Sequence, residues 1–443
     1  MKKTLSTQSI GRGLILFILI FGLLLPAAGV WGQEETPPLY LPLVLRDYPP
    51  TPTPTPKPLL PPLSTATHTP EIAFTPQNFL FLPLVARYDL PPAPLYATSI
   101  YIQNPTSSEF YNLGCAQGLR DRNLPGQQDN LVVLAFGNMW KVGSQYTLRT
   151  YYTNPNTGTR TNLTFAEVEN LARQYLLGYL SCSDGNSLLA LGIGSNNYDD
   201  MNIDNDPYKF SPDQATLRQT AYAFGQRFAD TTYNLNEWIR ASGYADRLWV
   251  MGALDIEWAG RELDKQTGKY YYWWNTPYVT GGWVEGFNAN SRGRELYLNY
   301  GACVGCPTRP NPNWVFTTTR DANNVVMDWS QGDVYYVSWG APPALPLPEI
   351  YDKNGVLARQ WQAVSLYGAL YKGGKMTFAG AMTQYLACQQ RYDPRNPSQN
   401  CDTLKIDNTP EEGWSQLYYW LNQDRRTAQQ VLRWVTDIRW QIK

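Results

Sequence analysis

An alternation of apolar runs and amphipathic segments between residues 131 and 257 constrains the fold more than any other feature of the chain. The runs LVVLAF (131–136), LLALGIG (188–194) and RLWVMGALDIE (247–257) each have the length of a buried strand. Two segments with helix-start signals lie between them, TFAEVENLARQYLLGYL (164–180) and SPDQATLRQTAYAFGQRF (211–228). Strands that alternate with helices form right-handed crossovers and a parallel sheet. The pattern therefore predicts an α/β fold.

The length of the region favours a (β/α)8-type TIM barrel over an open α/β sheet. From residue 95 to residue 443 the chain has the size of one barrel with insertions. Three further clear strands and two weaker candidates are ELYLNYG (295–301), DVYYVSW (333–339), KMTFAGAMTQY (375–385), TLRTYYT (147–153) and ARQWQAVSLYG (358–368). With six clear strands and two weaker ones, we predict a barrel over residues 95–443.

The residues before the barrel have the composition of an export signal followed by a stalk. Basic residues precede an apolar run at 14–25 and small residues follow it, so residues 1–32 are expected to be a signal peptide cleaved before Gln33. An uncleaved membrane anchor is the alternative, because the run is only slightly short of a bilayer span. Residues 33–94 carry a Thr/Pro-rich linker between two aromatic-LPLV-x-R segments. We expect a secreted or cell-surface protein that meets a membrane only through an uncleaved N-terminal segment.

Cysteine usage and charge narrow the class of protein further. Six cysteines fit an oxidising compartment, where three disulfides in fifteen pairings are open. CVGC (303–306) has two other interpretations, half of a zinc site or a redox pair. Lys plus Arg (36) nearly balances Asp plus Glu (37), so no basic field exists to attract a nucleic acid.

The single histidine excludes several catalytic chemistries. His68 lies in the Thr/Pro-rich linker, so the predicted barrel contains none. A Ser-His-Asp triad, a Cys-His pair and a histidine zinc site are therefore excluded there. Carboxylate chemistry remains, and 31 Tyr and 16 Trp residues offer flat apolar platforms that suit sugar rings.

Several predicted strands turn polar at their carboxyl ends, where a parallel barrel places its active site. Asp255 and Glu257 lie two residues apart and share a face of their strand, so their repulsion should raise the pKa of one toward that of a general acid. The alternative is that Asp255 is a satisfied buried residue and Glu257 lines a rim. Asp199 and Asp200 are further candidate catalytic carboxylates. The candidate substrate-binding residues at strand ends are Asn138, Asn196, Asn197, Tyr198, Trp258, Trp339, Gln384 and Tyr385.

An acidic segment at 199–206 spaces four oxygen-bearing residues like calcium ligands. They are Asp200, Asn202, Asp204 and Asp206. The segment lacks the central glycine and the closing glutamate of an EF-hand loop, so an EF-hand is excluded. A looser calcium site stays open, and we expect no other metal or cofactor.

Three features together resemble the family-25 lysozymes (muramidases), which are secreted glycoside-hydrolase-like barrels. They are the export signal, the strand-end ALDIE (253–257), and the late VYYVSWG and FAGAMTQY segments. The likeness spans about residues 130–390. It implies that Glu257 is the acid and that Asp255 orients the substrate or an N-acetyl group.

The chain departs from these lysozymes at one catalytic position. They carry an Asp on the first strand, whereas the first strand identified here leads to Asn138. Either Asp199 or Asp200 replaces that Asp, or catalysis is lost.

The sequence is consistent with two functions of different classes. The first is an exported glycoside hydrolase that uses carboxylate acid/base catalysis on peptidoglycan or another polysaccharide. It needs a second carboxylate near Glu257, about 5 Å away for a retaining enzyme and farther for an inverting one. The available partners are Asp199, Asp200, Asp333 and Glu349. The second is a non-catalytic carbohydrate-binding or adhesive cell-surface protein with the same TIM-barrel fold.

Overall fold

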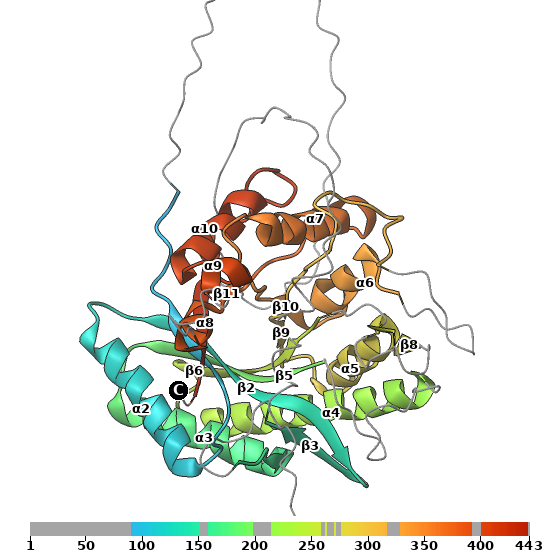
Figure 1. Cartoon of the computed structure of the whole chain (residues 1–443). Coiled ribbons are helices and arrows are strands. Elements are labelled where there is room, and N and C mark those ends of the chain that lie inside the picture. Colours follow the sequence, from blue (N-terminus) through green and yellow to red (C-terminus); the bar gives the residue numbers. More distant parts are fainter. Residues whose placement is uncertain are drawn as a thin grey trace, which may run out of the picture.

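Eight parallel strands form a nearly closed barrel in the part of the chain that the structure describes, and helices surround them (Figure 1). The structure is a computed structural model, and it describes residues 90–150, 158–197, 214–257, 262–263, 270–271, 276–316, 328–391 and 400–441. The predicted (β/α)8-type barrel is confirmed. Within these ranges no helix has both the length and the apolar character needed to cross a membrane.

The barrel strands follow one another around the ring in chain order. They are β1 (Ala97–Tyr101), β2 (Asp129–Val142), β5 (Leu188–Asn196), β6 (Leu248–Asp255), β9 (Tyr297–Asn299), β10 (Ala344–Pro346), β11 (Gly380–Thr383) and β12 (Trp434–Trp440). Neighbours from β1 to β10 pair in parallel, as do β11 with β12 and β12 with β1. Between β10 and β11 the ring closes through a parallel bridge of Glu349 with Met382 and a hydrogen bond from Ile350 N to Met382 O (2.8 Å).

Helices connect the strands and cover the outside of the barrel. The longer ones are α2 (Ser107–Asn123), α3 (Phe165–Cys182), α4 (Gln214–Ala241), α5 (Pro277–Asn290), α7 (Val356–Tyr371) and α10 (Pro410–Leu421). The shorter ones are α6 (Gln331–Tyr335), the π-helical turn η1 (Tyr336–Gly340), α8 (Tyr385–Arg391) and α9 (Cys401–Leu404). In Figure 1, α2, α3 and α4 lie on one side of the strands, and α7 and α10 lie on the opposite side. The expected start of α3 is confirmed, because Thr164 and Glu167 form a capping box.

Short antiparallel elements accompany the barrel. They are β3 (Gln145–Arg149), β4 (Asn162–Thr164), β7 (Glu262–Leu263) and β8 (Tyr270–Tyr271). β3 pairs antiparallel with the far end of β2, so the predicted strand at 147–153 belongs to a hairpin and not to the barrel.

Two other strand predictions are wrong. The segment 333–339 forms α6 and η1, because Ser330 and Asp333 make a capping box that starts a helix there. The segment 358–368 lies in α7, whose buried side chains recur at helical spacing. The strands that complete the ring are β1, β10 and β12, which we did not predict. β1 and β10 are only five and three residues long.

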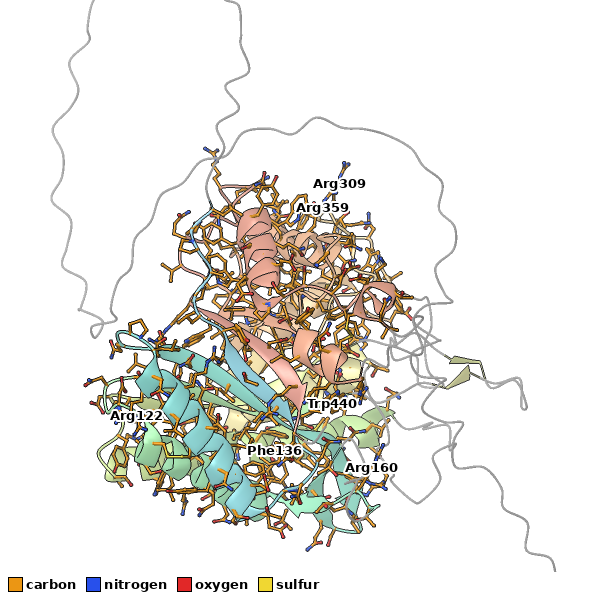
Figure 2. The ribbon with its side chains drawn as sticks, turned by 60° about the vertical axis from the view of Figure 1, so that its left-hand side comes forward. Arg122, Phe136, Arg160, Arg309, Arg359 and Trp440 are labelled. Atoms are coloured by element: carbon orange, nitrogen blue, oxygen red, sulfur yellow. A yellow bond between two sulfur atoms is a disulfide. The ribbon has the colours of Figure 1, made fainter. Side chains whose placement is uncertain are left out.

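Alternation along each strand divides the apolar side chains into two cores. In β6, Met251 and Ala253 belong to the cluster inside the barrel, whereas Val250 and Leu254 join the larger cluster between strands and helices. Phe136, labelled in Figure 2, likewise leaves β2 toward α2, where its ring stacks on Phe110 at 5.6 Å between centroids. The barrel is therefore a filled core with the polar ends of its strands above it.

Two pairs of neighbouring helices pack with their backbones almost touching. α2 meets α3 at Gly114 and Gly178, where a Cβ on either residue would overlap the backbone of the facing helix. α4 meets α5 in the same way at Gly225 and Gly286. Only residues without a side chain permit approaches this close.

Three disulfides join all six cysteines, and all of them lie in the barrel region, as the sequence allowed. The pairs are Cys115–Cys182, Cys303–Cys306 and Cys388–Cys401. The zinc interpretation of CVGC is wrong, because its two sulfurs bond each other. Both residues of that pair are buried, which shields the sulfurs from a thiol partner.

Candidate active site

Three carboxylates from two strands meet at the carboxyl end of the barrel. Asp255 is the last residue of β6, Glu257 follows it by two, and Glu349 follows β10 by three. One oxygen of each carboxylate lies within 4.8 Å of the corresponding oxygen of the other two. The group, called here the acidic triad, thus combines the fourth and sixth strands of the ring.

Strand alternation explains why these side chains converge. Leu347 lies in the inner core, and Glu349 and Tyr351 continue its parity beyond β10. Asp255 and Glu257 continue the inward parity of β6 in the same manner, while Ile256 joins the helix-side core. The apolar interior beneath them leaves Asp255 only 7% exposed and Glu349 1% exposed.

Asn197 fixes the backbone that carries Glu257. Its side-chain oxygen accepts a hydrogen bond from Glu257 N (2.8 Å), and its Nδ2 donates to Glu257 O (2.9 Å) and to Thr280 Oγ1 (3.1 Å). Asn197 N also donates to Asp255 O (3.1 Å). Because the N–H and C=O groups of Glu257 are both hydrogen-bonded, its backbone is fixed in place, and this limits the positions that its side chain can reach.

Gln384 holds the other glutamate. It follows β11, and its Nε2 donates to Glu349 Oε1 at 2.6 Å. Both Asn197 and Gln384 were predicted as substrate-binding residues. In the structure they contact the acidic triad or the backbone that carries it.

Burial is the main cause of the perturbed acidity in the triad. It raises the pKa of Glu257 to about 7, and burial together with the charge of Glu257 raises the pKa of Glu349 to about 8. The pKa of Asp255 is raised well above its usual range by burial first, and then by the charges of Glu257 and Glu349. Burial and these carboxylates also raise the pKa of the Tyr351 hydroxyl.

No positive side chain among the described residues offsets this charge. The ion pairs there involve neither Asp255 nor the two glutamates, and Asp255 Oδ1 is buried with no hydrogen-bond partner in those ranges. The alternative that Asp255 is a satisfied buried residue is therefore not supported. Three acids without a counter-cation can share protons, donate them, or hold a metal ion.

Another buried carboxylate, Asp437 in β12, has a structural role. It accepts hydrogen bonds from Thr383 Oγ1 (2.8 Å), Tyr385 N (2.9 Å) and Leu386 N (2.9 Å), so it caps the start of α8. Burial raises its pKa to about 6 despite these bonds. The predicted binding residue Tyr385 thus contributes its backbone to this cap.

Two predicted amides line the same rim. Asn138 pairs in register with Asn196, and Asn196 pairs with Asp255, so Asn138 of β2 lies beside the carboxyl ends of β5 and β6. One premise about Asn138 was wrong, because β2 is the second strand of the ring and β1 is the first.

Other predicted residues fall elsewhere. Trp339 does not end a strand, since it lies in η1 and packs against the helix-side core. Asp333 caps α6 and is not a partner of Glu257. The predicted residues outside the described ranges are Tyr198, Asp199, Asp200, Asn202, Asp204, Asp206 and Trp258.

The triad should make the folded protein less stable as the pH rises. The pKa of both glutamates is higher in the folded than in the unfolded state. Their contribution to the free energy of unfolding is therefore fully present below about pH 4, and it is lost as the pH rises through about 7 and 8. We expect the wild type to lose on the order of 3 kcal/mol more than the Glu257→Gln/Glu349→Gln double variant between pH 5 and pH 9. Urea unfolding in EDTA at both pH values measures this, and parallel losses in the two proteins would contradict it.

Comparisons with known proteins leave the site to be interpreted from its own geometry. No protein-family model matches the chain, and no curated protein matches its sequence.

Proposed function

We propose that this protein is an exported glycoside hydrolase that acts on peptidoglycan or another polysaccharide. The observation that carries the proposal is the approach of Glu257 and Glu349, with one oxygen of each within 4.8 Å, at the strand ends of a (β/α)8-type barrel. Glycoside hydrolysis needs two such carboxyl groups on either side of the scissile bond. The short spacing favours a retaining mechanism, for which about 5–5.5 Å is typical, over an inverting one at about 6.5–9.5 Å.

Glu257 suits the role of general acid. It is half-buried, its pKa of about 7 keeps a large protonated fraction at neutral pH, and Asn197 holds its backbone. As the glycosidic bond breaks, Glu257 gives its proton to the departing oxygen. In the second step it takes a proton from the water that hydrolyses the glycosyl-enzyme ester.

Glu349 suits the role of nucleophile. Burial and the charge of Glu257 raise the pKa of Glu349 to about 8, so the reactive form is the one in which Glu349 has lost its proton while Glu257 keeps one. The Gln384 amide that donates to Oε1 favours this charged form of Glu349 and leaves the second oxygen for the anomeric carbon. That oxygen forms the ester bond while the bonding electrons leave with the protonated sugar oxygen. Asp255 adds a negative charge beside both glutamates and, by the resemblance to muramidases, would orient the substrate or an N-acetyl group.

Export is supported by features outside the site. Three disulfides suit an oxidising compartment, and the N-terminal sequence has the pattern of a signal peptide. Polysaccharides of the cell envelope or surroundings are the substrates that an exported enzyme of this type meets.

The Glu257→Gln variant tests the proposal directly. We expect the wild type to release reducing ends from at least one glycan in a panel that includes peptidoglycan, and Glu257→Gln to do so about 10²–10³-fold more slowly, because the acid is lost. Glu295→Gln is the matched control. Glu295 is 1% exposed and lies at the opposite end of the barrel, just before β9, so this variant should keep wild-type activity.

Two outcomes would contradict hydrolysis. One is equal release by wild type and Glu257→Gln, and the other is no release from any glycan by either protein. Retained glycan binding without hydrolysis would favour the carbohydrate-binding alternative.

A further inference from the structure

The acidic triad has the geometry of a divalent-cation site. The three oxygens lie within 4.8 Å of one another, so an ion between them would lie near the Ca²⁺–oxygen distance of about 2.3–2.6 Å after movements of a few tenths of an ångström. Among the described residues, the acidic triad is the group of three or more Asp, Glu, His or Cys side chains whose ligand atoms come this close to one another.

The orphaned oxygen of Asp255 is a second, independent sign of a missing ligand. Asp255 is only 7% exposed, and its buried Oδ1 finds no hydrogen-bond partner among the described residues. A buried polar atom without a partner costs about 1–3 kcal/mol, and more if it is charged. A cation seated between the carboxylates would satisfy this oxygen and offset the negative charge of the acidic triad.

The ligand atoms select the kind of ion. All three are carboxylate oxygens, which suit hard cations and not Cu⁺ or the softer N/S sites of zinc. Mg²⁺ requires near-ideal octahedral geometry at about 2.0–2.1 Å, which oxygens spread over up to 4.8 Å meet poorly. Ca²⁺ tolerates irregular shells of six to eight oxygens, and water can complete them.

We propose that Asp255, Glu257 and Glu349 bind one Ca²⁺-sized divalent cation, and that this ion inhibits hydrolysis by occupying the oxygens that donate the proton and attack the sugar. The ion and the reacting proton compete for the same atoms. Calcium would therefore act as an inhibitor and not as a cofactor. The inference shares its residues with the proposed function, but cation binding is measurable without any substrate.

Binding is tested on the full chain after removal of metals with EDTA. At pH 8 we expect calorimetric titration with CaCl₂ to give a Kd of about 10⁻⁴–10⁻³ M, typical of extracellular calcium modules. The melting temperature should rise by about 2–4 °C at 10 mM CaCl₂, and less with MgCl₂. Asp255→Asn and Glu349→Gln, which keep the shape and remove one charge each, should weaken Ca²⁺ binding at least about tenfold. Glu295→Gln should bind as the wild type does.

A second variant separates this site from the other candidate calcium segment. Asp204→Asn removes a carboxylate from residues 199–206, where the sequence alone left a calcium site open. Binding that survives in Asp204→Asn and is lost in Asp255→Asn supports the acidic triad. The reverse pattern, or no binding by the wild type up to 20 mM CaCl₂, overturns the inference.

The two proposals can fail separately. If Ca²⁺ binds at the triad and no glycan is cleaved, the cation site stands and the hydrolase assignment falls. If a glycan is cleaved and 10 mM CaCl₂ changes neither the rate nor the melting temperature, the hydrolase stands and the cation site falls. If both stand, the Ca²⁺ concentration for half-inhibition should match the Kd within about threefold.

Discussion

Hydrolysis of any glycan that the wild type cleaves should fall at least about 10⁴-fold when Glu349 is replaced by alanine, because the variant has no group to form the covalent intermediate. The reaction with an activated aryl glycoside of the same sugar should be restored in part by sodium azide. Azide fits the space vacated by the carboxylate and attacks the anomeric carbon from the same side. The product should be a glycosyl azide of inverted configuration, which NMR of the anomeric proton identifies.

The stereochemistry of the azide product also checks the two roles. If Glu349 were instead the acid/base, azide would attack a glycosyl-enzyme formed elsewhere and give a product of retained configuration. That result would contradict Glu349 as nucleophile and exchange its role with Glu257. An unchanged rate in Glu349→Ala would remove Glu349 from the mechanism.

Replacing Gly286 by alanine should cost at least about 3 kcal/mol of unfolding free energy. A Cβ at this position of α5 would overlap the carbonyl oxygen of Tyr222 in α4, so the two helices would have to separate. Backbone cannot rotate out of the way as a flexible side chain can. Urea unfolding followed by tryptophan fluorescence measures the loss.

The same helix supplies a matched control. At Gly281 the nearest atom to an added Cβ is Arg218 Nη1 at 3.4 Å, an ordinary contact with a movable side chain. Gly281→Ala should therefore be neutral or stabilising by up to about 1 kcal/mol, since alanine is the better helix former. Equal effects of the two substitutions would mean that the α4–α5 contact does not limit stability.

Local sequence patterns were sufficient to predict three of the first four barrel strands. β2, β5 and β6 are long apolar runs, and Thr164 caps α3 between β2 and β5, whereas the expected helix start at Ser211 lies outside the described residues. In the second half the patterns predicted β9 and β11 but not β10 and β12. β10 has only three residues, with prolines around it, and tertiary pairing with β9 defines it more than β propensity does.

The candidate site, too, could be predicted from the sequence only in part. Asp255 and Glu257 lie on a strand that the sequence identifies, and alternation alone puts them on one face. Glu349 could be named only as an available carboxylate, because its strand was not recognised. Every second residue of ALPLPE (344–349), from Leu345 to Glu349, faces the interior or the acidic end, and this alternation is the signal that could have located Glu349.

The pairing of β1 with β12 sets when the molecule can finish folding. Ser99 Oγ and Thr436 Oγ1 lie 2.7 Å apart across this seam, although 337 positions separate them along the chain. A nascent polypeptide can pair β1 with β2, but the other edge of β1 has no partner until residues 434–440 have emerged, and contacts between such distant segments form slowly. Removal of β12 should leave the edges of β1 and β11 unpaired, and such exposed strand edges promote aggregation.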